Sequence, residues 1–350
     1  MTANHPVAQI HLDHISANFK LITSRAPGAR RMAIVKANAY GHGVAEVAAS
    51  LTDANALAVA RVTEGMELRA IQPDKPIVVL EGYLDAAEAN ACDTYDLTPV
   101  IHSDHQLPFL QPDRPFWLKF NTGMFRLGFE LDSAPALARQ LSGKNLQGLM
   151  THFANADNPD HDLNENQIQQ FAACCEAFPT APRCIGNSGV ILQLPRGQGD
   201  WVRPGIMLYG GSPFGSPLSE LKPGMTVSAP VIAIRTLTAG DAIGYGSSWQ
   251  AEKSSRIGIV AFGYADGYPR EVPEGTPILV NGKRRPLVGR ICMDMCFVLL
   301  NDQDQIQPGD HCTFWGEDLP IDEIAAAADT ISYTLMTGLG PRVKRVFSYQ

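Results

Sequence analysis

Several features that define other protein classes are missing from this chain of 350 residues. No apolar run approaches the roughly 20 residues that a membrane-spanning helix requires. The start, MTANHPVAQIHLDH, lacks the basic and apolar regions of a signal peptide. The seven cysteines form no C-x-x-C pair, so neither a disulfide framework nor a zinc site is predicted. We therefore expect a cytoplasmic protein with no membrane segment and no metal site.

An excess of positive charge is missing too. The net charge of −8 argues against nucleic acid or an anionic membrane as the main partner. It leaves room for a local cationic pocket that binds a small anion. Charged residues make up 18% of the chain and hydrophobic residues 45%, which is enough to bury a substantial core. The length suits two domains better than one.

Short apolar runs alternate with helical patterns from residue 30 to about 210, which is typical of a parallel sheet. Eight such units favour an α/β fold of the closed (β/α)8 barrel type. No G-x-G-x-x-G follows the first strand, which weakens the alternative of an open dinucleotide-binding sheet. The predicted strands are MAIVK (32–36), ALAVA (56–60), PIVVL (76–80), LTPVI (97–101), FWLKF (116–120), GLMTHF (148–153), RCIGN (183–187) and WVRPG (201–205).

Helices between these strands are predicted from apolar residues spaced at i, i+3, i+4 and i+7. One helix is expected behind Ser133 as its N-cap, and another behind Asn164. His161 and Asp162 are assigned to the loop that precedes the second of these helices.

The pattern changes after a stretch rich in proline and glycine. Short alternating strands are separated by turn residues, and Asn281-Gly282 between apolar runs predicts a hairpin. A helix is predicted near 321–336. We expect a barrel domain over residues 1–222 and a mostly β C-terminal domain over residues 223–350.

The nonapeptide VKANAYGHG (35–43) carries the strongest indication of chemistry. Lys36 follows a buried strand, and a primary amine there suits a Schiff base with a carbonyl cofactor, provided that the pocket partly desolvates it. A lone lysine of this kind is more often a solvated turn residue. In a barrel, however, chemistry occurs at the C-terminal ends of the strands. A polar residue stands at each of these ends: Lys36, Arg61, Glu81, His102, Lys119, His152, Asn187 with Ser188, and Arg203.

A phosphate site is predicted from the loops after the last two strands. Ser188 opens a helix after the seventh strand, and the amides of Gly205 and Ile206 follow the eighth. Pyridoxal 5'-phosphate would supply both the aldehyde for Lys36 and the phosphate for this site.

With these residues in place, the sequence closely resembles the alanine racemase family of pyridoxal-phosphate enzymes over essentially its whole length. The resemblance implies a homodimer that interconverts L-alanine and D-alanine, with part of the β domain reaching into the partner's barrel. The matching segments are VKANAYGHG (35–43), LKFNTGMFRLGF (118–129), MTHFANAD (150–157), NSG (187–189), VRPGIMLYG (202–210), IGYGSSW (243–249), GYADGYPR (263–270), RICMDM (290–295) and GLGPRVKRVF (338–347).

The resemblance implies roles for individual residues. Lys36 matches the lysine that binds the cofactor and acts as one catalytic base, and Tyr245 matches the opposing base. The positions that match contacts of the cofactor phosphate are Tyr40, Ser188, Gly205, Ile206 and Tyr333.

Other matches surround the cofactor ring and the substrate. Arg203 matches an arginine that faces the pyridine nitrogen, and His152 a histidine beside the ring that contacts this arginine. Lys119 matches a lysine that many relatives carbamylate, and Asn121 stands where many relatives have Asp. The positions that match substrate contacts are Arg126, Tyr264 and Met293.

These residue types suit the inversion of a carbon centre. Inversion needs one proton-exchanging group on each face of a planar intermediate. Lysine and tyrosine side chains have pKa values of about 10 in water, so both pKa values must be shifted towards neutrality. An arginine keeps its proton, so it leaves a pyridine nitrogen unprotonated and makes the ring a weaker electron sink. Racemisation is then favoured over transamination or decarboxylation.

Three alternatives remain open at this stage. A decarboxylase of basic amino acids would have a carboxylate where the VRPG arginine stands. A racemase of broad specificity would admit serine, although Tyr264 and Met293 suggest a small pocket. A cofactor-carrying barrel protein without turnover would lack the second domain. Lys119 itself is either carbamylated or a strand lysine that extends to solvent.

Overall fold

The structure is a computed structural model that describes residues 5–349. Contacts divide the chain into two compact units. The barrel unit comprises Ser16–Ala39 and Gly43–Leu208. The β unit combines the N-terminal residues up to Ile15 with Tyr40–His42 and the chain from Tyr209 onward. A short turn after the first barrel strand therefore belongs to the β unit, although the chain around it belongs to the barrel.

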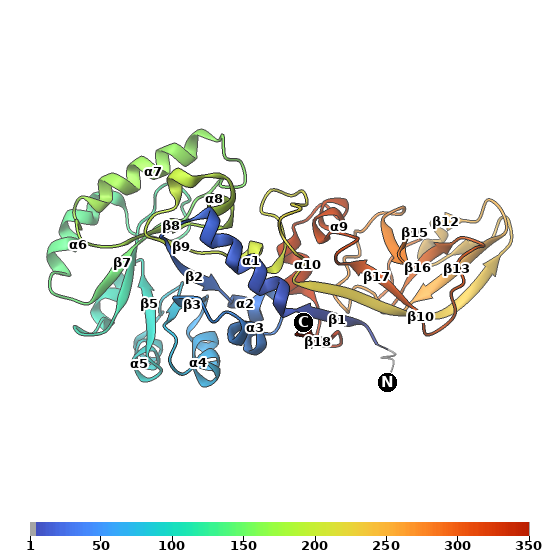
Figure 1. Ribbon diagram of the computed structural model, residues 1–350, viewed down its shortest axis with the longest axis horizontal. Helices are drawn as coiled ribbons and strands as arrows, with labels where there is room; N and C mark the ends of the chain where they lie inside the picture. Colours follow the sequence, from blue (N-terminus) through green and yellow to red (C-terminus); the bar gives the residue numbers. More distant parts are fainter. Residues whose placement is uncertain (1–4, 350) are drawn as a thin grey trace. The chain divides into compact units, whose positions relative to one another are not determined.

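Eight parallel strands close into a barrel, which confirms the predicted fold (Figure 1). Several strands end earlier than predicted. The first ends at Ile34, before Lys36, and the last ends at Val202 because Pro204 has no amide hydrogen to extend the ladder. The barrel strands are β2 (Arg30–Ile34), β3 (Ala56–Val59), β4 (Ile77–Val79), β5 (Leu97–Ile101), β6 (Phe116–Lys119), β7 (Leu146–Met150), β8 (Arg183–Gly186) and β9 (Trp201–Val202).

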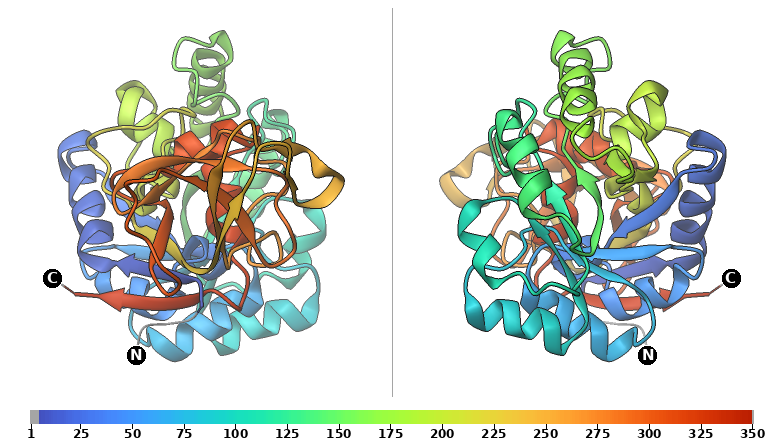
Figure 2. Two further views of the ribbon diagram at one scale, coloured as in Figure 1. Left: turned by 90° about the vertical axis from the view of Figure 1, so that its right-hand side faces the viewer. Right: turned by 90° about the vertical axis from the view of Figure 1, so that its left-hand side faces the viewer.

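Helices surround the barrel strands on the outside (Figure 2). The helices of the first 210 residues are α1 (Leu12–Arg25), α2 (Lys36–Tyr40), α3 (Val44–Ser50), α4 (Val62–Ile71), α5 (Ala86–Thr94), α6 (Ala134–Gln140), α7 (Asp162–Cys175) and α8 (Ser188–Gln193). Four 3-10 segments at Asp104–Phe109, Leu131–Ser133, Pro195–Gly197 and Ile206–Tyr209 complete the connections.

The starts of two helices need correction. Ser133 occupies the predicted N-cap position of α6, but its hydroxyl donates to the carbonyl of Glu130 and makes no capping hydrogen bond. The assignment of Asp162 to a loop is wrong, because helix α7 begins at this residue, and the ring of His161 accepts a hydrogen bond from the amide of Leu163. Asn164 lies buried inside this helix, and its side chain donates to two carbonyls of the preceding loop.

The β unit is built on a sheet in the order β13-β16-β15-β14-β17-β10-β1-β18. The predicted hairpin at Asn281-Gly282 is confirmed, because both residues have positive φ, 49° and 73°, between paired strands. The strands of the sheet are β1 (Val7–His11), β10 (Met225–Leu237), β13 (Ser255–Val260), β14 (Pro277–Val280), β15 (Lys283–Val288), β16 (Cys296–Leu300), β17 (His311–Trp315) and β18 (Lys344–Ser348). A separate short hairpin consists of β11 (Ala242–Ile243) and β12 (Trp249–Gln250).

The single helix predicted near 321–336 is instead two helices, α9 (Ile321–Ala327) and α10 (Ser332–Gly338). Asp329 has a φ of 50° and breaks the helical path between them. The buried carboxylate of Asp322 accepts hydrogen bonds from the amide of Ser212 and the hydroxyl of Ser332, so it anchors the start of α10. Among the described helices, none is both long enough and apolar enough to span a bilayer.

Candidate active site

Lys36 lies two residues after the end of β2, at the start of a left-handed turn. Residues 37–40 all have φ between 52° and 54°, although none of them is glycine. This conformation costs an L-residue roughly 1–2 kcal/mol, so specific contacts must hold the turn. One such contact joins the side-chain oxygen of Asn38 to the amide of Val44 at 2.8 Å.

The amine of Lys36 is partly buried and has cationic neighbours. Burial lowers its pKa below the usual range, and the charge of Arg126 lowers it further. Glu81 and Glu64 oppose this shift less strongly. The predicted desolvation of Lys36 therefore has a physical basis in the barrel unit.

Lys119 ends β6 and is only 8% exposed, so the alternative of a solvent-directed strand lysine is wrong. Burial and the charges of Arg203, Arg126 and Lys36 lower its pKa to about 7. Four basic side chains thus influence one another at this end of the barrel. Such a cluster favours a neutral amine, a modified lysine or a bound anion.

Arg203 is buried and uses its guanidinium to hold the ends of two neighbouring strands. It donates to the carbonyls of Cys184 and Thr151 at 2.7 and 2.6 Å, and to Nδ1 of His152 at 3.0 Å. Burial and the Arg203 charge hold the pKa of His152 well below its usual range, so the imidazole is neutral. Because Nδ1 faces a donor, the ring proton is on Nε2.

Arg126 sits on a loop beside this cluster. A hollow at the ends of β6 and β7 is lined by Lys119, Asn121, Arg126 and His152, among others. The side-chain oxygen of Asn121 accepts hydrogen bonds from the amides of Gly123 and Phe125, at 3.1 and 3.0 Å. Asn121 therefore shapes the loop that presents Arg126.

Ser188 and Gly205 meet after β8 and β9, as the sequence predicts for an anion site. The buried hydroxyl oxygen of Ser188 accepts a hydrogen bond from the amide of Gly205 at 2.9 Å and a longer one from the amide of Met207 at 3.5 Å. Since the oxygen accepts from Gly205, the hydroxyl proton is directed elsewhere and can be donated to an anion. Ile206 opens the following 3-10 segment and is buried.

Three tyrosines gather in the β unit. Tyr40 stacks on Tyr209 with ring centroids 4.8 Å apart, and Tyr333 lies 5.9 Å from Tyr40. Burial and the nearby Tyr333 raise the pKa of Tyr40, and burial raises that of Tyr209. Both hydroxyl groups therefore stay protonated and can act as donors.

Tyr245, Tyr264 and Met293 are exposed on the β unit, with exposed fractions of 69%, 40% and 52%. The amide of Tyr264 donates to the carbonyl of Cys292, so the loops that carry Tyr264 and Met293 lie side by side. Tyr245 begins a short 3-10 turn between β11 and β12.

Two residues that support the site were not predicted from the sequence. Gln167 is fully buried, and its amide donates to the carbonyl of His152 and the hydroxyl of Thr122, each at 2.9 Å. Glu64 accepts a hydrogen bond from the amide that follows Lys36. Gln167 is a polar residue on the buried face of α7, and this position in the helical pattern could have indicated its role.

The remaining polar residues of the strand ends form contacts of their own. Arg61 and Glu81 form an exposed ion pair at 3.8 Å. His102 contacts the carbonyl of Glu81 at 3.0 Å. Within residues 5–349, no group of three His, Cys, Asp or Glu side chains is arranged to hold a metal ion.

A closed parallel barrel with a partly desolvated lysine, a cationic cluster and a buried serine at its strand ends is typical of enzymes that bind a phosphate-bearing cofactor through lysine. Comparison with known families makes the class specific. The model of the alanine racemase N-terminal domain matches residues 10–213, and that of the C-terminal domain matches residues 224–347. The chain belongs to the alanine racemase family.

Individual relatives agree over nearly the whole chain. The chain is 44% identical to the alanine racemase of Chromohalobacter salexigens, covering 97% of this chain and 96% of that protein. The crystal structure of the biosynthetic alanine racemase from Pseudomonas aeruginosa has a TM-score of 0.92 and 39% identity, covering 99% of both chains. The alanine racemase of Bartonella henselae, solved with covalently bound pyridoxal phosphate, has a TM-score of 0.91 and 29% identity, covering 98% of this chain and 99% of that one.

Proposed function

We propose that this protein interconverts L-alanine and D-alanine with pyridoxal 5'-phosphate, using Lys36 and Tyr245 as bases on opposite faces of the substrate Cα. The observation that carries the proposal is Lys36 itself, a partly buried amine with a lowered pKa, two residues after the end of a barrel strand. Membership of the alanine racemase family supports the substrate.

The described residues fit the cofactor. The Ser188 hydroxyl and the amides of Gly205 and Ile206 would bind the phosphate, with Tyr40 and Tyr333 as further donors. When bound, pyridoxal phosphate supplies a covalent link to an amine and a conjugated ring that accepts charge from the substrate Cα.

Proton exchange is assigned to two side chains. A lowered pKa leaves more of Lys36 as the neutral amine at working pH, so its Nζ can accept a proton. The Oη of Tyr245 would return a proton on the other face. Nε2–H of His152, whose orientation Arg203 sets through Nδ1, would be the donor that stabilises the Tyr245 phenolate.

Arg203 would face the pyridine nitrogen and determine the reaction type. Its guanidinium already donates to Cys184, Thr151 and His152, and an arginine does not give up a proton in a protein. A ring whose nitrogen stays unprotonated withdraws electron density from Cα less strongly. Return of the proton to Cα is then favoured over transamination or decarboxylation.

Lys119 would carry a carbamate. With its pKa lowered to about 7, much of the amine is neutral near pH 7 and can attack carbon dioxide, releasing one proton as the N–C bond forms. The resulting anion would offset the charges of Arg126 and Arg203, and it would hold Arg126 for the substrate carboxylate.

The active form would be a homodimer. Tyr245, Tyr264 and Met293 are large, exposed side chains, and in the proposed dimer they complete the substrate site of the partner's barrel. In this arrangement residues 1–222 bind the cofactor and residues 223–350 supply the second base. A cytoplasmic location stays a prediction.

The decisive experiment follows optical rotation of L-alanine and of D-alanine with the purified holoenzyme, in normal and deuterated water. We expect both to reach the same racemic end point, with solvent deuterium at Cα. Tyr245→Phe should lower kcat by roughly 10²–10⁴-fold because one general base is lost. A holoenzyme that leaves both alanine enantiomers unchanged, or that racemises serine much faster, would overturn the assignment of substrate.

A further inference from the structure

Glu64 links two neighbouring loops at the C-terminal ends of the barrel strands. It occupies the first turn of α4 and is partly buried. One carboxylate oxygen accepts from the amide of Ala37 at 2.6 Å. The other accepts from the amides of Ala60 and Arg61, at 2.8 and 3.1 Å. The carboxylate thus joins the end of β3 to the turn that follows β2.

The contact with Ala37 is more than a helix cap. An acidic residue in the first turn of a helix commonly accepts hydrogen bonds from the amides at the helix start. In Glu64, the oxygen that faces Ala60 and Arg61 is sufficient for this capping role. The second oxygen is directed at the left-handed turn after Lys36. Ala37 is the first of the residues with φ between 52° and 54°, and its amide belongs to the peptide group that joins it to Lys36.

We propose that Glu64 is a positioning residue for Lys36: its bridging carboxylate fixes the first amide of the left-handed turn and thereby the direction of the lysine side chain. The inference rests on the proposed function of Lys36. The carboxylate also lies close enough to oppose the lowering of the Lys36 pKa, so the same group affects both the position and the protonation of the amine. The charged groups that influence this amine are Arg126, Glu81 and Glu64.

The chain offers matched variants. Glu64→Asp retains a carboxylate that can cap α4, but it is one methylene too short to span both loops. Glu64→Gln keeps the length but replaces one accepting oxygen by an NH2 group, which faces amide donors. Glu67→Gln is the control, because Glu67 lies three residues further along the same helix and is exposed.

The test compares the three variants with the wild-type holoenzyme by steady-state kinetics in both directions. We expect Glu64→Asp and Glu64→Gln to lower kcat by about 10- to 100-fold, with KM changed by less than about threefold. The reason is that displacement of the amine destabilises the transition state more than it weakens substrate binding. Glu67→Gln should stay within about twofold of the wild type.

Deuterium exchange of the peptide over residues 35–41 gives a readout that does not depend on turnover. The Ala37 amide should be protected in the wild type and in Glu67→Gln, and it should exchange at least about tenfold faster in Glu64→Asp. Wild-type exchange and kcat in Glu64→Asp would overturn the proposal. If Glu64→Gln does not fold, Glu64→Asp alone decides.

Failure of the proposed function would be seen elsewhere. It would appear in the wild type as absence of a covalent link at Lys36, or as full activity of Lys36→Ala. Failure of the Glu64 proposal leaves both of these results intact.

Discussion

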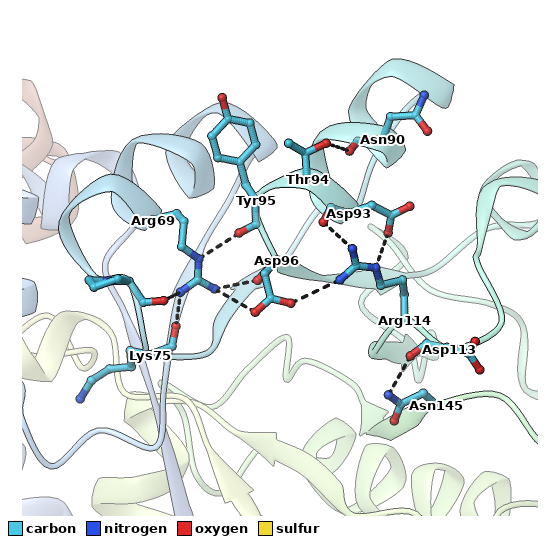
Figure 3. Close-up of polar contacts among 11 residues, drawn as sticks. Arg69, Lys75, Asn90, Asp93, Thr94, Tyr95, Asp96, Asp113, Arg114 and Asn145 are labelled. Atoms are coloured by element: carbon cyan, nitrogen blue, oxygen red, sulfur yellow. Dashed lines mark hydrogen bonds and ion pairs between the residues drawn. The ribbon is translucent and has the colours of Figure 1, made fainter.

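The two ends of the barrel compensate positive charge to different extents. At the end where the strands begin, Arg69 lies in the last turn of α4 with only 13% of its side chain exposed. Its guanidinium donates to five backbone carbonyls, and Figure 3 labels Lys75, Tyr95 and Asp96 among the residues that provide them. The acceptors are the carbonyls of Gln72, Pro73, Lys75, Tyr95 and Asp96, at 2.7 to 2.9 Å.

Neighbouring cations at this end are compensated in the same manner. Arg114 contacts both the carbonyl and the carboxylate of Asp93 and reaches the carboxylate of Asp96 (Figure 3). The amine of Lys75 donates to three carbonyls of the loop that precedes β3.

At the other end, Arg203 also donates to backbone carbonyls, those of Cys184 and Thr151. The two lysines differ, because burial and neighbouring cations lower their pKa values, and among the carboxylates only Glu81 opposes the shift of Lys119. Compensated charge stabilises a fold, whereas under-compensated charge at the strand ends predicts an anionic ligand. The comparison therefore separates stability from function within one barrel.

The largest expected effect tests the compensated end. Arg69→Ala leaves five carbonyls without their donor, so we expect a loss of about 3 kcal/mol in the free energy of unfolding. Since Arg69 lies away from the strand ends that carry Lys36, kcat at a temperature where the variant is folded should not change. Urea unfolding and polarimetry check the two expectations. An Arg69→Ala variant with normal stability but a low kcat would show that Arg69 serves catalysis and not stability, which contradicts the comparison.

Arg203→Glu tests the reaction type at the under-compensated end. A carboxylate can share a proton with the pyridine nitrogen, so pyruvate should form from alanine as a side product while racemisation falls by about 100-fold. Pyruvate is measured with lactate dehydrogenase in single-turnover samples. An unchanged ratio of pyruvate to inverted alanine would contradict the role of Arg203.

Lys119 connects charge to stability through pH. Its pKa is about 7 in the folded chain and close to 10.4 in an unfolded one, so between these values the unfolded chain binds more protons. The free energy of unfolding should therefore rise with pH over this range in carbon dioxide-free buffer. Lys119→Met removes the titrating group, and its curve should be flatter. Parallel curves for the two apoproteins would show that Lys119 is not the group responsible.

The smallest effect is expected for Arg61→Ala. Arg61 directly precedes α4, the helix whose last turn contains Arg69, but 76% of its side chain is exposed and its ion pair with Glu81 is 3.8 Å long. We expect a change below about 0.5 kcal/mol in the free energy of unfolding. A loss comparable to that of Arg69→Ala would mean that exposure does not distinguish the two arginines.

Periodicity and strand-end residues were sufficient to predict the barrel and the placement of Lys36, Lys119, His152 and Arg203. Features set by tertiary contacts escaped prediction. The left-handed turn after Lys36 contains no glycine at 37–40, so its sequence carries no signal for positive φ. Glu64 looks like an ordinary first-turn acid until its contact across to Ala37 is seen.

Other differences have local causes. The apolar residues near 321–336 have continuous helical spacing, but Asp329 adopts a left-handed conformation and interrupts the helix. The start of α7 at Asp162 depends on a histidine ring that caps the helix, and histidine is not among the usual N-cap residues. The sequence also could not decide whether Lys119 is exposed, because apolar neighbours in a strand are compatible with either face.

The central claim is that the under-compensated cations hold an aldehyde cofactor through Lys36. The most direct measurement reduces the holoenzyme with borohydride, digests it and locates the cofactor by mass spectrometry. We expect the added mass on the peptide that contains Lys36, with no label in Lys36→Ala. Label on Lys119 or on any other lysine, or no label in a holoenzyme that still racemises alanine, would contradict the account.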